Sequence, residues 1–142
     1  MTPTRRRRAV FAAVTATVVL ASLVPLPGGG PDRFLLGVGL DKWVHGVGYA
    51  AVSATFARAR TSGGTGAARP KATDSTVPTG SGPRWRVALA AVLVGTAVGG
   101  GVELLQTALA TRTASFADAA ANGVGAACGA LVWLRSSTRP RR

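Results

Sequence analysis

The sequence predicts an all-α fold, an integral membrane bundle of four transmembrane helices with the N-terminus and the C-terminus in the cytoplasm. Three observations lead to this prediction. Apolar residues make up 47% of the 142 residues and charged residues only 15%, and this charged fraction is low for a soluble domain. The apolar residues gather in long runs. The basic residues, which give the chain a net charge of +12, stand between those runs and not along one helical face.

The first apolar run covers residues 9–26, which are 18 residues without a charge. A helix needs about 20 apolar residues to cross a hydrocarbon core of about 30 Å, so this run predicts the first span. Residues 1–8 before it form a basic cytoplasmic N-terminus. Arginines followed by an apolar run also describe a cleaved secretory signal or a twin-arginine export signal, and that alternative stays open.

The second run, residues 42–57, is the shortest of the four. Asp41 stands where a helix N-cap is expected, and residues 34–40 suit an interfacial segment at the start of the span. Residues 58–86 are rich in Gly, Ser, Thr, Pro and basic residues, and they hold too little apolar surface to fold. We therefore expect a disordered cytoplasmic linker there.

Two further apolar runs follow the linker. Residues 87–110 and 116–134 predict the third and fourth spans, so the membrane domain covers residues 9–134. Residues 135–142 then form a basic cytoplasmic tail. Both spans carry glycines at small-xxx-small spacing, which predicts close helix packing; these are Gly95, Gly99, Gly125 and Gly129.

The distribution of basic residues selects the orientation. With a cytoplasmic N-terminus, 14 basic residues lie inside and three lie outside, namely Arg33, Lys42 and Arg112. The chain is therefore expected to be a multi-pass protein of the bacterial cytoplasmic membrane, in contact with membrane lipids. Nucleic-acid binding is not expected, because no aromatic residues interleave with the basic ones. Cys128 has no Cys or His at metal-ligand spacing, and no metal or cofactor is predicted.

Six polar residues in or beside the apolar runs are expected to meet at one depth. A charge near the membrane centre costs at least about 2.5 kcal/mol, so Glu103 needs a partner or a function. In the predicted topology the three helix ends that carry these residues face outside, and residues four apart share a helix face. At about 1.5 Å per residue, the side chains reach one layer in the outer half of the membrane. They are Asp41, His45, Glu103, Gln106, Asp118 and Asn122.

These residues, in their order and spacing, resemble the VanZ-like family of membrane proteins. The resemblance runs from the second span to the fourth. Its motifs are Asp41-Lys42-x-x-His45-x-x-x-Tyr49, Glu103-x-x-Gln106 and Arg112-x-x-Ser115-x-x-Asp118-x-x-x-Asn122-x-x-Gly125. The resemblance implies a small four-helix membrane protein with a role in the cell envelope. It also implies a link to low-level glycopeptide (teicoplanin) resistance, with which the founding member is associated.

The chemistry of these residues favours an outward-facing site for an envelope-related ligand, such as a lipid head group or a lipid-linked cell-wall precursor. Lys42 and Arg112 at the outer rim are suited to hold a phosphate or carboxylate. A carboxylate beside an imidazole supports general-base catalysis, for which the candidates are His45, Glu103 and Asp118. The predicted binding residues are Asp41, Lys42, His45, Glu103, Gln106, Arg112, Ser115, Asp118 and Asn122.

Other interpretations stay open. In a noncatalytic membrane scaffold or interaction protein, the polar residues only satisfy one another, at about 1 kcal/mol or less per contact. In an intramembrane enzyme that acts on a lipid head group, Ser115 is a candidate nucleophile, although an N-cap of the fourth helix is its simpler role. A metal held by His45, Glu103 and Asp118 has suitable ligand types but no supporting local spacing. Enzymatic activity and oligomeric state are therefore left undecided.

Overall fold

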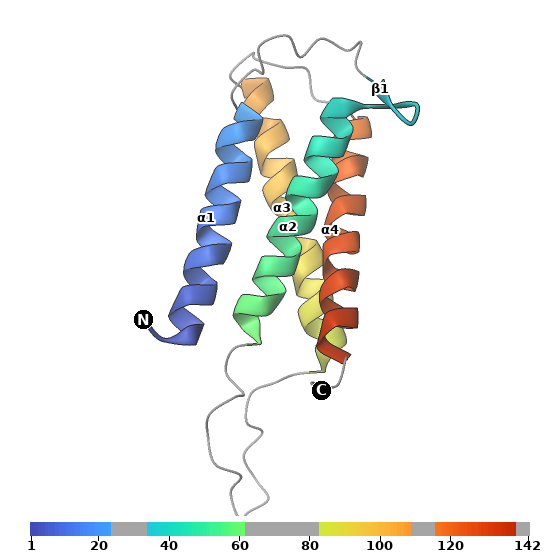
Figure 1. Ribbon diagram of the computed structural model, residues 1–142. Helices are drawn as coiled ribbons and strands as arrows, with labels where there is room; N and C mark the ends of the chain where they lie inside the picture. Colours follow the sequence, from blue (N-terminus) through green and yellow to red (C-terminus); the bar gives the residue numbers. More distant parts are fainter. Residues whose placement is uncertain (24–33, 62–82, 109–115, 139–142) are drawn as a thin grey trace, which may run out of the picture.

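The computed structural model describes residues 1–23, 34–61, 83–108 and 116–138. Within these ranges the chain has four helices lying side by side and one small hairpin (Figure 1). Successive helices run in opposite directions, so α1 and α3 begin at the end of the bundle where α2 and α4 finish. The prediction of an all-α fold with four helices is confirmed over this part of the chain. The elements are α1 (Pro3–Leu23), β1 (Phe34–Leu35), β2 (Val38–Gly39), α2 (Leu40–Arg60), α3 (Arg84–Ala108) and α4 (Phe116–Thr138).

Helix α1 begins before the first apolar run, at Pro3. The hydroxyl of Thr2 accepts a hydrogen bond from the Arg5 backbone N–H at 3.3 Å, and the Thr2 carbonyl accepts one from Arg6 N–H at 3.0 Å. Proline suits the first turn because the N–H that it lacks would be unpaired there. Arginine is a good helix former, so the helix includes most of the predicted basic N-terminus, residues 1–8. Hydropathy had located the apolar part of the helix and not its start.

A tight hairpin leads into α2. Phe34 pairs with Gly39 across two antiparallel strands, and the turn between them holds Leu36 at φ 55° and Gly37 at φ 77°. Two successive positive φ angles are typical of the turn that matches the twist of a two-residue hairpin. The prediction that Asp41 caps α2 is wrong: the helix begins at Leu40, and Asp41 lies inside its first turn. A carboxylate in this turn still interacts favourably with the helix dipole.

Three other helix boundaries lie beyond the predicted ones, toward longer helices. The predicted linker 58–86 is helical at its margins, because α2 continues to Arg60 and α3 begins at Arg84. Residues 62–82 of that linker lie outside the described residues. Helix α4 continues to Thr138, beyond the predicted end at 134. Apolar composition ends where charge begins, whereas a helix can continue through charged residues, because arginine is a good helix former.

Small residues let the helices approach closely. A Cβ atom added to Gly125 would overlap the backbone carbonyl of Gly46, and one added to Gly129 would overlap that of Ala50. Helices α2 and α4 accordingly share the most extensive contact in the bundle. On α3, a Cβ atom at Gly99 would lie 2.8 Å from the Asn122 side-chain amide. The predicted packing through small residues is confirmed.

Large apolar side chains face outward, and the buried ones are mostly small. The buried apolar core comprises Ala57, Ala88, Ala91, Ala130 and Trp133. Exposed positions on α3 and α4 include Leu89, Leu93, Leu104, Leu105, Val124, Leu131 and Val132. Among the described residues, two helices, α3 and α4, are long and apolar enough to cross a membrane. Helices α1 and α2 are less apolar because each of them includes four basic or acidic residues close to its ends.

Candidate functional site

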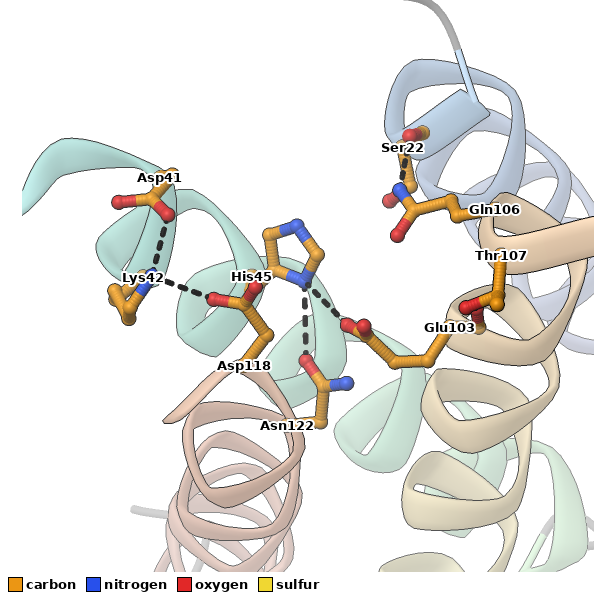
Figure 2. A network of polar contacts seen from close by, with 9 residues as sticks. All are labelled: Ser22, Asp41, Lys42, His45, Glu103, Gln106, Thr107, Asp118 and Asn122. Atoms are coloured by element: carbon orange, nitrogen blue, oxygen red, sulfur yellow. Dashed lines mark hydrogen bonds and ion pairs between the residues drawn. The ribbon is translucent and has the colours of Figure 1, made fainter. Parts of the chain in front are cut away.

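Polar side chains gather at the end of the bundle where α2 and α4 begin and α3 finishes (Figure 2). Six of the nine predicted binding residues meet there in two neighbouring groups, which together we term the polar cluster. Gln106 lies at the same end but bonds to α1. Arg112 and Ser115 lie outside the described residues. The polar cluster consists of Asp41, Lys42, His45, Glu103, Asp118 and Asn122.

The first group surrounds the ring of His45. Its Nδ1 atom lies 3.2 Å from Asn122 Oδ1 on α4 and 3.8 Å from Glu103 Oε1 on α3. All three side chains are buried. With Nδ1 donating to the amide oxygen, a neutral ring keeps Nε2 as an acceptor, and Figure 2 shows Nε2 pointing away from both partners. Tyr49 is fully buried beside His45, and the centre of its ring lies 6.1 Å from that of the imidazole.

The second group is an ion-pair chain at the rim. The Lys42 ammonium lies 2.5 Å from Asp41 Oδ2 and 2.7 Å from Asp118 Oδ1, so it joins the first turn of α2 to that of α4. Of the two carboxylates expected as partners of His45, Glu103 is the one that lies beside it, and Asp118 pairs with Lys42. Lys42 contacts two carboxylates, and its role in holding an anionic ligand stays a prediction.

Gln106 on α3 connects α1 to this end of the bundle. Its side-chain amide donates to the carbonyl of Ser22 near the end of α1, at 2.5 Å. Gln106 and Glu103 are three residues apart, so both point to the buried side of α3. The contact to Ser22 has no signal in the sequence, because its acceptor is a backbone group. Contacts at this end of the molecule therefore involve all four helices.

Two buried polar atoms of the first group have no hydrogen-bond partner among the described residues. They are Glu103 Oε1 and Asn122 Nδ2. Glu103 is 7% exposed and Asn122 is 1% exposed. A buried polar group without a partner costs about 1 to 3 kcal/mol, and more when it is charged, so the pair marks a place where further hydrogen bonds are needed. One atom is an acceptor and the other a donor.

This arrangement can bind and orient a polar group, and it can exchange a proton through His45 Nε2. It does not assemble three metal-ligating side chains: no group of three or more His, Cys, Asp or Glu residues in the described ranges could hold a metal ion. Asp118 is directed to Lys42, which leaves only His45 and Glu103 close to each other. The three side chains considered as metal ligands therefore do not converge on one point: Glu103 lies beside His45, and Asp118 contacts Lys42.

One buried polar residue was missed at the sequence level. Ser53 on α2 is fully buried, and its hydroxyl donates to the carbonyl of Ala91 on α3 at 2.8 Å. His45, Tyr49 and Ser53 are spaced by four residues and so follow one helix face. That periodicity was available in the sequence and would have identified Ser53 as part of the same buried face.

Comparisons with protein families, with curated proteins and with solved structures find no match to this chain.

Proposed function

We propose that the chain is a VanZ-like, four-helix protein of the bacterial cytoplasmic membrane, with both termini in the cytoplasm. Its polar cluster binds an envelope-related ligand from the outer side, either a lipid head group or a lipid-linked cell-wall precursor. The family assignment is supported by the motifs that begin at Asp41, Glu103 and Arg112, in that order along the chain. Through that resemblance, the proposal includes a role in teicoplanin resistance.

The distribution of side chains supports a membrane location for the whole bundle. Leu104 is 74% exposed, whereas its neighbour Glu103 is buried, which inverts the pattern of a soluble helix. Lipid accommodates such leucines, and buried polar groups in membrane proteins face the bundle interior. Helices α1 and α2 have 21 residues each, or about 32 Å at 1.5 Å per residue, and they lie alongside α3 and α4. This arrangement supports the proposal of four spans.

Charge supports the orientation. All nine arginines in the described ranges lie at the end of the bundle opposite the polar cluster. They belong to the start of α1 and α3 and to the last turns of α2 and α4: Arg5, Arg6, Arg7, Arg8, Arg58, Arg60, Arg84, Arg86 and Arg135. Basic residues near the ends of spans favour the cytoplasmic side. The polar cluster is then at the outer side.

One observation carries the ligand proposal, namely the two buried atoms without partners beside His45. In a purely structural hydrogen-bond network, Glu103 Oε1 and Asn122 Nδ2 would be satisfied by other helices. A ligand that supplies a donor to Glu103 and an acceptor to Asn122 satisfies both atoms.

The charges of the polar cluster narrow the chemistry of the ligand group. The described residues at this end carry three carboxylates and a single ammonium, and that ammonium already contacts Asp41 and Asp118. A bare phosphate would be repelled by Glu103, whereas a hydroxyl or amine group would donate to it. Sugar hydroxyls of a cell-wall precursor or the amine of a lipid head group meet this requirement.

The experiment is to purify the protein in polymer-bounded native membrane discs and to identify the lipids enriched over the bulk membrane. We expect one envelope lipid or precursor to be enriched with the wild-type protein and lost from His45→Ala and Glu103→Gln. Leu104→Ala, which changes a lipid-facing neighbour of Glu103, is the matched control and should keep the ligand. The thermal midpoint of each variant is measured in parallel. Equal lipid composition in all four discs would refute the proposal.

A scaffold function is the second candidate, and a separate observation favours it. Lys42 with Asp118 and Gln106 with Ser22 are direct contacts between helices, as expected of groups that hold a bundle together. In that case His45→Ala and Glu103→Gln would lower the thermal midpoint and no lipid would be enriched.

Teicoplanin resistance is tested in a strain that lacks the protein. Expression of the wild type should restore the resistance level, whereas expression of a stably inserted His45→Ala variant should not.

A further inference from the structure

The basic end of the bundle contains a cavity of about 260 Å³ between the start of α1 and the last turns of α2. The start of α1 and the last turns of α2 lie at the end of the bundle opposite to the one where α2 and α4 begin and where the polar cluster is found (Figure 1). The residues that line it are Pro3, Arg6, Arg7 and Val10 of α1 and Thr55 and Arg58 of α2. Three of the six carry a guanidinium group, and Pro3 and Val10 supply apolar wall.

Helix geometry separates the arginines of this end into two sets. Arg6 and Arg7 line the cavity, whereas the neighbouring Arg5 and Arg8 do not. On α2, Arg58 lines the cavity, and the guanidinium of Arg60 instead lies over the ring of Phe56, 6.0 Å from its centre. The chain therefore directs a particular subset of its basic side chains into one space.

The electrostatics of this space call for an anion. The first turn of a helix carries the positive end of its dipole, where acidic residues are favourable and basic ones are not. Helix α1 has no acidic residue in its first turn, and none of the described residues at this end is acidic. Guanidinium groups bind phosphate oxygens through paired N–H donors. A phosphate in the cavity would offset both the dipole and the repulsion between the arginines.

We infer that this cavity binds the phosphate of an anionic phospholipid head group. The site is independent of the ligand proposed for the polar cluster. Its volume suits a head group and not a whole lipid, and Val10 lies at the start of the apolar run 9–26, along which the rest of a lipid would lie. Thr55 forms only wall, because its hydroxyl donates to the carbonyls of Ala51 and Val52. Basic pockets between spans on the cytoplasmic side are suited to such head groups.

Two triple variants of the full chain test the assignment, and both remove the same charge from the same end. Arg6→Gln/Arg7→Gln/Arg58→Gln empties the cavity of guanidinium groups. Arg5→Gln/Arg8→Gln/Arg60→Gln is its matched control. Each protein is purified in a neutral detergent and titrated with short-chain phosphatidylglycerol, with short-chain phosphatidylcholine and with inorganic phosphate. Bound lipid is counted by native mass spectrometry, and the thermal midpoint is followed in the same titrations.

We expect wild type and the control triple to bind phosphatidylglycerol saturably and with dissociation constants within about twofold of each other. The cavity triple should bind at least about tenfold more weakly, since each arginine near an anionic surface contributes to affinity. An equal loss of affinity for phosphatidylglycerol in both triple variants would show that the lipid is attracted by the overall positive charge of this end, and it would overturn the proposed site. Equal stabilisation by inorganic phosphate alone would overturn the lipid assignment. His45→Ala should bind phosphatidylglycerol as wild type does. A negative result for this cavity can therefore be distinguished from a negative result for the polar cluster.

Discussion

His45 Nδ1 lies 3.2 Å from Asn122 Oδ1, and this contact joins residues 77 positions apart in the chain. It fixes the ring orientation and assigns the proton of a neutral imidazole to Nδ1. The other ring nitrogen is then available to accept a hydrogen bond or a proton from a ligand. Asn122 is therefore a positioning residue for His45 through Oδ1, in addition to the contact that its Nδ2 is proposed to make with the ligand.

Changing the amide at this position tests that role. Asn122→Ala removes the acceptor for Nδ1, and we expect the enriched lipid to be lost at a cost in stability of about 1 kcal/mol. Asn122→Asp retains an oxygen at the Oδ1 position but removes the Nδ2 donor, so it should lose less ligand enrichment than Asn122→Ala. The readouts are the lipid composition of native discs and the thermal midpoint. If the Asp and Ala variants lose the ligand equally, the positioning role is wrong.

The ion pair between Lys42 and Asp118 is expected to stabilise the contact of α2 with α4. Lys42 is partly exposed, with 27% of its side chain accessible, so the coupling should be modest, at about 0.5 to 1 kcal/mol. A double-mutant cycle with Lys42→Met and Asp118→Asn measures it by reversible unfolding in mixed micelles. High salt should reduce the coupling, because this pair is at the rim. Additive single-mutant effects would show that the two groups do not interact.

Helix contact at Gly125 should tolerate no added methyl group. Gly125→Ala places a Cβ atom against the Gly46 backbone, which cannot move aside as a flexible side chain can. We expect a loss of about 1 to 3 kcal/mol of unfolding free energy, typical of overpacking. Gly123→Ala, two residues earlier on α4, meets nothing within 4 Å and is the matched control. It should be neutral or stabilising by up to about 1 kcal/mol, because alanine favours helix over glycine.

Topology is tested by labelling single cysteines with a membrane-impermeant reagent in intact cells. Cys128 is exposed and is first replaced by serine. Phe34→Cys places a thiol in the hairpin beside the polar cluster, and Thr138→Cys places one at the arginine-rich end. We expect labelling at position 34 from outside, and at position 138 only after the cells are opened. The reverse pattern would move the polar cluster to the cytoplasmic side and remove the basis for an outward-facing site.

Much of the fold could be predicted from the sequence because hydropathy and charge are local properties. Residues 87–110 and 116–134 were found to within a few positions of α3 and α4, and the glycine spacing correctly indicated close packing. Helix ends were less predictable. Asp41 was expected to cap α2, but a hairpin with a strained turn leads directly into the helix one residue before it. Such a turn depends on backbone geometry that apolar composition does not reveal.

By itself, the sequence determined which polar residues share one end of the bundle, since this depends only on their distance from the helix ends. The tertiary structure alone decided which of them touch. A helix turns by about 100° per residue, so small rotations about each axis select different partners. For this reason His45 lies beside Asn122 and Glu103, whereas Asp118 forms an ion pair with Lys42. The buried, unpartnered atoms beside His45 are a consequence of that selection, and the proposed function is based on them.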